Sequence, residues 1–429
     1  MLSQPPLGTR PGMTKVTPQN NREAYVLYAL GFLFLPVAAL ATLQIWVLAV
    51  IGVALIIALR IPHQNFWPLS NRLLLVLLAL FAGWAALSLV WTINPDRGVK
   101  TAIRLALVGT SLIFLIDAAT RLDHAQRLSF GRWLVRGTII GLTVIGLFIA
   151  LSGPLSDWLG TSARAGHELD SLNRTASVIA MLVWPVALVV AQLYGRYAAA
   201  AVIVMSALAL YFLAPSAPLV AFLVGACAFG MGWISQRWGK RLLFVGFTAA
   251  VIAIPFFDIL VPVINDWLIA NIPGPNSEVH RFVIWEFASQ RIFEQPLFGW
   301  GLEAARTIPG GHDQIFLFQF GDNPTMGQAM PLHPHNALVQ IWLELGLIGL
   351  LLIAAVFSLI VVSIPESANN RAAPATMIAA TACAFTIAEL GFGIWQGWWM
   401  ATLGLTAMIV IAAVPLGTDR GANSPLTRD

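Results

Sequence analysis

The stretch NALVQIWLELGLIGLLLIAAVFSLIVVS, residues 336–363, is almost entirely apolar and carries a single charge, on Glu344. A helix needs about 20 apolar residues to cross the hydrocarbon core of a bilayer, which is roughly 30 Å thick. The stretch therefore predicts a membrane-spanning helix. His333, Pro334 and His335 come immediately before it, so a polar and titratable segment is expected where this helix begins at the membrane surface.

The composition of the whole chain is that of a membrane protein. Of its 429 residues, 58% are hydrophobic and 10% are charged, whereas soluble domains carry about 25% charged residues. The first 23 residues are polar, and the apolar run after them is too long for the core of a signal peptide, so no cleavable signal is expected. Cys227 and Cys383 both lie in apolar runs, which indicates no disulfide framework. The net charge of +4 does not indicate nucleic-acid binding.

The apolar runs predict an all-α polytopic membrane protein with about 12 transmembrane helices. We expect a cytoplasmic tail over 1–23, transmembrane helices 1–9 over 24–263 with a periplasmic loop at 153–174, a long periplasmic loop over 264–335, transmembrane helices 10–12 over 336–415, and a cytoplasmic tail over 416–429. The sequence ATLQ, 41–44, is the expected turn between the first two spans. The long loop is expected to contain short helices on the outer membrane surface, because its aromatic residues recur at partly helical spacing.

Basic residues orient the predicted bundle, since cytoplasmic loops carry an excess of Lys and Arg. With the N-terminus in the cytoplasm, sixteen of the 24 Lys and Arg residues fall inside and eight outside. Both ends of the chain are therefore predicted to be cytoplasmic. On this topology five of the seven histidines face outward: His167, His280, His312, His333 and His335.

His335 is the strongest candidate for chemistry, and it has two interpretations. It is either a polar residue at a wet interface or a general base. The positive end of a helix dipole disfavours imidazolium at this position, and a neutral imidazole accepts a proton near pH 7. Asn336 follows it and is placed to orient a polar ligand. His333 lies two residues earlier, and without a His-Glu-x-x-His pattern the pair predicts no metal site.

Two outward arginines are candidates for binding an anion. Arg281 either snorkels from an interfacial helix, pairs with Glu278 or Glu286, or grips phosphate oxygens with its planar fork. Arg174 lies at the outer beginning of a span, where helix amides favour anions. Glu344 lies nine residues after His335, or about 13 Å along a helix, which favours a role in helix packing.

The spacing of His335, Asn336, Gly346 and Gly349 resembles the pattern of the O-antigen ligase and O-antigen polymerase superfamily of bacterial envelope glycosyltransferases. That pattern is His, then Asn, Ser or Gln, nine residues, Gly, two residues, and Gly, Thr or Tyr. A second likeness lies in RFVIWEFASQRIFEQPLFGWG, 281–301, where an Arg and a Trp precede a Pro-Leu-Phe-Gly-x-Gly run. Relatives often carry a Ser-Arg pair at the outer beginning of the span predicted at 217–235. Here Ala217 follows the serine, and Arg174 is our candidate substitute.

The resemblance implies transfer of a glycan from undecaprenyl diphosphate to a sugar hydroxyl of lipid A–core, at the periplasmic face of the inner membrane, in lipopolysaccharide biosynthesis. It implies that His335 is the base of an inverting glycosyltransferase, and that Arg281, Arg174, Asn336 and His333 bind substrate. It calls for membrane lipid around the protein but for no cofactor, metal or nucleic acid. The alternatives are a polymerase of the same superfamily and, from another class, a membrane transporter.

Overall fold

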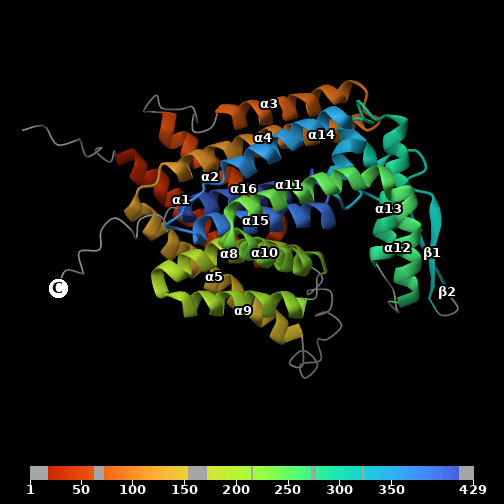
Figure 1. Ribbon diagram of the computed structural model, residues 1–429. Coiled ribbons are helices and arrows are strands. Elements are labelled where there is room, and N and C mark those ends of the chain that lie inside the picture. Colours follow the sequence, from red (N-terminus) through yellow and green to blue (C-terminus); the bar gives the residue numbers. More distant parts are fainter. Residues whose placement is uncertain are drawn as a thin grey trace, which may run out of the picture.

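A computed structural model describes residues 18–61, 72–152, 172–213, 216–271, 277–320 and 323–414. Within these ranges the molecule is a bundle of long helices with a smaller layer at one end (Figure 1). The bundle helices are α1 (Pro18–Ala41), α2 (Ile45–Arg60), α3 (Arg72–Leu87), α4 (Pro95–Thr120), α5 (His124–Ser152), α8 (Asn173–Tyr194), α9 (Arg196–Leu213), α10 (Ser216–Ile234), α11 (Gln236–Ala253), α14 (Ala337–Ser363), α15 (Ala372–Leu390) and α16 (Gly397–Ala413).

The helices bear out the predicted all-α membrane fold. Among the described residues, ten helical segments are long and apolar enough to cross a membrane. The first of them, Arg22–Arg60, combines α1 and α2, which are separated by the 3-10 turn Thr42–Gln44, and α16 is a shorter apolar helix. The predicted turn at ATLQ thus coincides with a break in the helix. Helix α8 lies at the centre of the bundle, and nearly all of its side chains from Thr175 to Val190 are buried.

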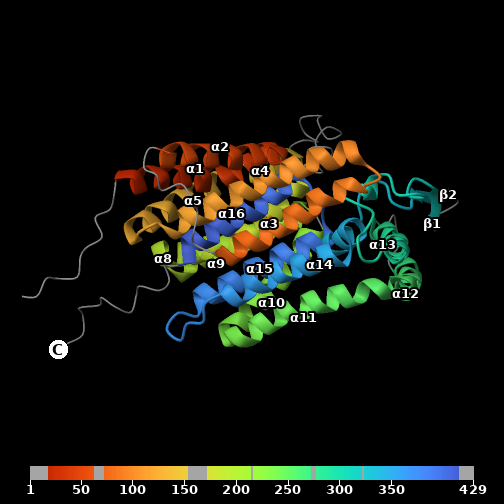
Figure 2. The same ribbon diagram turned by 90° about the horizontal axis from the view of Figure 1, so that it is seen from above.

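The layer at one end is built from α12 (Phe257–Asn271), α13 (Ser277–Glu294), the 3-10 turn η5 (Ala304–Arg306), and strands β1 (Gln314–Phe320) and β2 (Asn323–Gln328) (Figures 1 and 2). The ninth expected span, 241–263, is not one helix. Helix α11 ends at Ala253, and the turn Ile254–Phe256 with Pro255 separates it from α12, because proline has no N–H to continue a helix.

The long outer loop was expected to contain short helices, and this expectation missed a β-hairpin. Strands β1 and β2 pair antiparallel, with Ile315 opposite Gly327 and Phe316 opposite Met326. The hairpin packs on α13 through a small cluster that contains Val279, Leu317 and Phe318. The run IFLF, 315–318, is rich in strand-forming residues, but it lies in a loop that we interpreted by helical spacing.

Most of the first outer loop, 153–171, lies outside the described residues.

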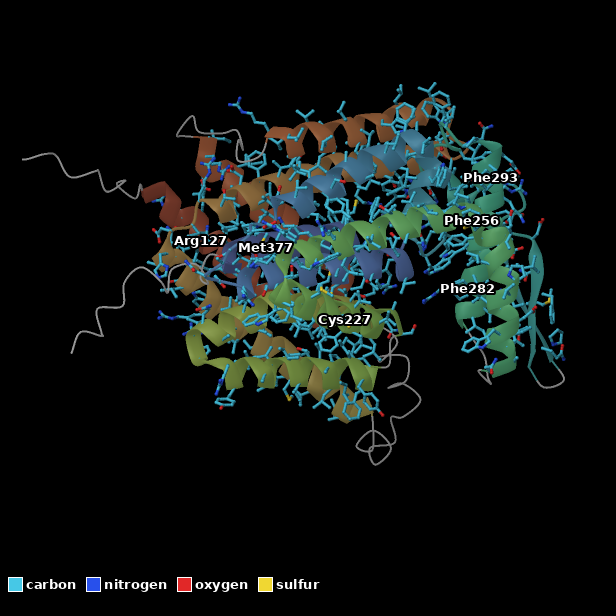
Figure 3. All side chains as sticks on the ribbon, in the orientation of Figure 1. Arg127, Cys227, Phe256, Phe282, Phe293 and Met377 are labelled. Carbon is cyan, nitrogen blue, oxygen red and sulfur yellow. The ribbon has the colours of Figure 1, made fainter. Side chains whose placement is uncertain are left out.

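At the opposite end of the bundle, buried charges hold helices together. Arg60 is fully buried and forms ion pairs of 2.8 Å with both Glu23 of α1 and Asp117 of α4, and Asp117 also pairs with Arg121. Arg127, labelled in Figure 3, donates hydrogen bonds to carbonyl oxygens at the ends of α4 and α16. These carbonyls have no partner within their own helices. Buried charges that are paired cost far less than isolated ones, so this end of the bundle is held together electrostatically.

Candidate active site

His335 lies in the turn that leads into α14, at the same end of the molecule as α12, α13 and the hairpin. Its backbone is in the left-handed region, with φ 54°, which is uncommon for a residue with a Cβ. Its Nδ1 atom lies 2.7 Å from the carbonyl oxygen of Gly391. A carbonyl oxygen only accepts, so we assign the proton of the neutral ring to Nδ1. The lone pair is then on Nε2, which is the form that a general base requires.

The segment that carries His335 is held from two sides. Trp285 of α13 donates from its indole N–H to the carbonyl oxygen of Pro334, at 2.7 Å. On the other side, the ring of His333 lies 4.2 Å from the ring of His335 and accepts a 3.2 Å hydrogen bond from the His335 N–H. The amide of Gln396 lies 3.2 Å from Nε2 of His333. His333 is buried, so it supports His335 from behind.

Both histidine rings are in surroundings that disfavour the charged form. The pKa of His335 is lowered mainly by burial, and also by the electrostatic effects of Arg281 and His280, against the opposing effect of the Gly391 carbonyl. The pKa of His333 is lowered to about 3 by burial, with smaller effects from His335 and Arg306. Both rings are therefore neutral near pH 7, and His335 is ready to accept a proton.

Asn336 is the N-cap of α14. Its Oδ1 accepts the Val339 N–H at 2.9 Å. Its carboxamide also forms a hydrogen bond with Glu389 of α15, and the same carboxylate accepts from the backbone of Leu338. Two of the free amides of the first helical turn are thus satisfied by protein groups. This arrangement favours a positioning role for Asn336, whereas the sequence analysis assigned it to a substrate.

Arg281 lies on α13, four residues before Trp285, and so on the same face of the helix. It is half-buried, and it lies close enough to His335 to lower the pKa of that ring. No described acid forms an ion pair with it, and the side chain of Glu278 is outside the described part. The face of α13 that holds the histidine segment therefore also presents a guanidinium beside the proposed base.

Arg174 stands apart from this group. It is the second residue of α8 and half-buried, and its neighbour Thr175 donates to the carbonyl oxygen of Ala38 at 2.6 Å. Ala217 is buried in the first turn of α10, which packs against α8. No contact among the described residues joins Arg174 to His335 or Arg281. The structure brings together His333, His335, Asn336 and Arg281, but it does not bring Arg174 to them.

Helix α14 is broken at Gly346, and the loop 296–301 fills the break. Gly346 has φ 66° and ψ −170°. The carbonyl oxygens of Leu343 and Glu344 accept from the backbone N–H groups of Trp300 and Gly301, at 2.9 and 2.8 Å, and the Leu347 N–H donates to Pro296. A Cβ on Gly346 would collide with the backbone of this loop. The two sequence patterns that resemble the family are therefore parts of one structural unit.

Glu344, which the sequence analysis assigned to helix packing, connects three segments below the site. Its carboxylate accepts hydrogen bonds from the Gln340 side chain at 3.0 Å, from the Trp395 indole at 2.7 Å and from the Glu303 N–H at 2.5 Å. Trp395 belongs to the 391–396 turn, whose Gly391 carbonyl holds His335. Sequence reasoning did not connect Glu344, Glu389 or Gln396 with the site. For Glu344 and Glu389 the sequence did contain a signal of function, because each is an isolated acid in an apolar helix.

Comparison with known proteins relates part of the chain to a family. The family model described as "O-Antigen ligase" matches residues 200–354, which include α13, the histidine segment and the break in α14. This part of the chain is therefore similar to the O-antigen ligase superfamily. Similar proteins named "Putative polysaccharide ligase" include one from Rickettsia conorii, 25% identical over 77% of this chain and 77% of its own length. Others are from Rickettsia felis, 24% identical over 77% and 78%, and Rickettsia bellii, 26% identical over 75% and 76%.

The matched region contains the His-Asn helix start, the glycine break and the Pro-Leu-Phe-Gly-Trp-Gly loop, and the loop packs into the break. The family and its fold support a multi-pass membrane protein of the polysaccharide ligase type. Among the described residues, no group of three or more His, Cys, Asp or Glu side chains is placed to hold a metal ion.

Proposed function

We propose that the protein transfers a glycan from undecaprenyl diphosphate to a sugar hydroxyl of lipid A–core at the periplasmic face of the inner membrane. The observation that carries the proposal is the position of His335 near Arg281, with Nδ1 held by the Gly391 carbonyl oxygen and with no described residue hydrogen-bonded to Nε2. A base and a cation next to each other, at the end of a membrane-spanning helix, suit a donor whose lipid part stays in the bilayer.

In this mechanism Nε2 of His335 takes the proton of the acceptor hydroxyl. The hydroxyl oxygen bonds to the anomeric carbon from the face opposite the diphosphate, and the bond from carbon to phosphate oxygen breaks. The electron pair leaves with undecaprenyl diphosphate, so the anomeric configuration inverts. Arg281 stabilises the negative charge that grows on the departing diphosphate, and Arg174 is a second cation for it only if the donor extends to the beginning of α8.

Substitution of the base tests the proposal. His335→Ala should abolish polysaccharide-capped lipopolysaccharide while the protein remains folded in the membrane. His312→Ala is the matched control, because His312 is an exposed histidine in the same outer layer with no part in the site. Capped product at the normal level from His335→Ala would overturn the proposal, and loss of product from both variants would indicate a general defect of the outer layer.

A further inference from the structure

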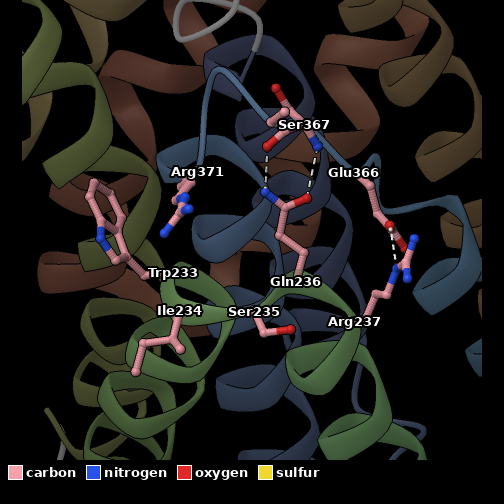
Figure 4. Close-up of a pocket in the computed structure, with 9 residues that line it drawn as sticks. Trp233, Ile234, Ser235, Gln236, Arg237, Glu366, Ser367 and Arg371 are labelled. Atoms are coloured by element: carbon pink, nitrogen blue, oxygen red, sulfur yellow. Dashed lines mark hydrogen bonds and ion pairs between the residues drawn. The ribbon is translucent and has the colours of Figure 1, made fainter.

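A pocket of about 440 Å³ lies at the far end of the bundle from His335. Helix α14 begins beside the histidine segment and ends at Ser363, and its part after the break at Gly346 alone rises about 25 Å. The pocket lies beyond this end, between the α10–α11 turn and the loop that joins α14 to α15 (Figure 4). It therefore lies near the opposite membrane surface, which our topology makes cytoplasmic.

The two segments that form the pocket are fixed to each other. Gln236 donates from its amide to the carbonyl oxygen of Ser367 and accepts from the Ser367 N–H, both at 2.7 Å (Figure 4). This pair of hydrogen bonds joins the first residue of α11 to the 364–371 loop. A ligand would thus meet walls whose backbone is already in place, which lowers the cost of ordering on binding.

One wall of the pocket is cationic. Arg371 is exposed at the beginning of α15, and its guanidinium has no ion pair or hydrogen bond in the part of the chain that the structure describes. The acid on the rim, Glu366, is already engaged by Arg237 at 3.3 Å and by Lys240 at 3.5 Å. Arg237 and Lys240 thus neutralise the carboxylate of Glu366. The planar N–H donors of the Arg371 guanidinium remain available for a ligand.

The other wall is apolar and faces outward. Trp233 and Ile234 at the end of α10 are 46% and 74% exposed, and they line the same pocket as Arg371 (Figure 4). Tryptophan is enriched at the level of lipid headgroups. A cationic wall beside an exposed apolar wall matches an amphiphile, with an anionic head and a hydrocarbon body, better than a wholly soluble anion.

We propose that this pocket binds an anionic phospholipid, with the headgroup phosphate on Arg371 and the glycerol and upper acyl chain against Trp233 and Ile234. Basic pockets between spans on the cytoplasmic side recognise anionic headgroups. The site is separate from the proposed active site and does not depend on the reaction assigned to it.

Native mass spectrometry of the full-length protein tests the site. The probes are phosphatidylglycerol, phosphatidylethanolamine and inorganic phosphate. Arg371→Ala should weaken phosphatidylglycerol binding about fivefold, the factor for about 1 kcal/mol per basic residue at an anionic surface. Arg196→Ala is the matched control, because Arg196 is exposed at the beginning of α9 and does not line the pocket. It should leave the affinity unchanged, and Trp233→Ala should also weaken binding.

Three results would overturn the proposal. Equal affinity of wild type and Arg371→Ala for phosphatidylglycerol would remove Arg371 from the site. Equal retention of phosphatidylethanolamine would remove the preference for an anionic lipid. Displacement of phosphatidylglycerol by an equal concentration of inorganic phosphate would make the ligand a free anion. If Arg371→Ala fails to fold, Arg371→Lys takes its place; it keeps the charge and should retain about wild-type affinity for phosphatidylglycerol. Trp233→Ala is then the variant in which this affinity should fall.

Discussion

At the scale of single residues, the proposed chemistry depends on a His335 ring that stays neutral. The general base works only when it is deprotonated, so a lowered pKa extends activity toward acid pH. Burial is the largest cause of the lowered pKa, and the charge of Arg281 adds to it. Arg281→Gln removes this charge, stabilises imidazolium, and should raise the pKa of His335.

The measurement is the pH dependence of the transfer rate by purified protein. In Arg281→Gln the maximal rate should fall because diphosphate binding is weaker. In addition, the acid limb of the pH–rate profile should move to higher pH. Arg291→Gln is the control, because Arg291 lies on the same helix but is paired with Glu294 at 2.6 Å. An acid limb that stays in place, or moves to lower pH, would contradict the role of Arg281 in the charge state of the base.

Asn336 provides a second prediction at this scale. Asn336→Asp keeps an oxygen for the Val339 N–H, but it replaces the group that faces Glu389 by a second carboxylate. Two neighbouring carboxylates repel each other when both are charged. Asn336→Ser keeps a good cap without the added charge. Thermal stability in detergent should therefore fall in the order wild type, Asn336→Ser, Asn336→Asp, and Glu389→Gln should restore part of the stability of Asn336→Asp. No such rescue would mean that the two side chains do not interact.

At the scale of elements, the break in α14 determines how the site is built. Gly346→Ala would place a Cβ against the loop backbone, in a region of φ and ψ that is almost confined to glycine and that costs about 1–3 kcal/mol in a residue with a side chain. Both thermal stability and transfer should fall. Gly109→Ala is the matched control, since Gly109 lies in α4 with no atom near its missing Cβ, and it should be neutral or slightly stabilising. Equal behaviour of the two variants would refute the role of the break.

The sequence predicted the elements better than their junctions. Long apolar runs predict spans, because a bilayer demands about 20 apolar residues whatever the surroundings. The break at Gly346 has no comparable local signal, since glycine is also tolerated inside a helix, and it depends on backbone groups from residues 296–301. The histidine segment was found by its position and its likeness to the family. Its partners Gly391, Glu389 and Gln396 come from α15 and the turn after it, and only the fold places them beside His335.

At the scale of the whole molecule, the two ends of the bundle have different chemistry. One end holds the histidine segment and α13, and the other holds the Arg60 ion pairs and the pocket beside Arg371. We predict that the first faces the periplasm. In a Cys227→Ala background, His312→Cys should react with a membrane-impermeant maleimide on intact spheroplasts, and Ala368→Cys only after permeabilisation. Both positions are exposed, and Cys383 is buried, so it should remain unreactive. The reverse pattern would invert the topology.

The same orientation bears on which transfer the protein performs, because a ligase and a polymerase use the same donor at the same membrane face and differ in the acceptor. A ligase consumes lipid-linked polymer, so a cell that lacks this protein should accumulate long polymer on undecaprenyl diphosphate while its lipid A–core stays uncapped. A polymerase produces that polymer, so its loss would leave lipid A–core capped with single repeats. We expect the first pattern, as judged by electrophoresis of lipopolysaccharide and of the lipid-linked fraction. Wild-type protein should reverse it and His335→Ala should not, whereas single-repeat caps in the deletion strain would make the protein a polymerase with the same catalytic histidine.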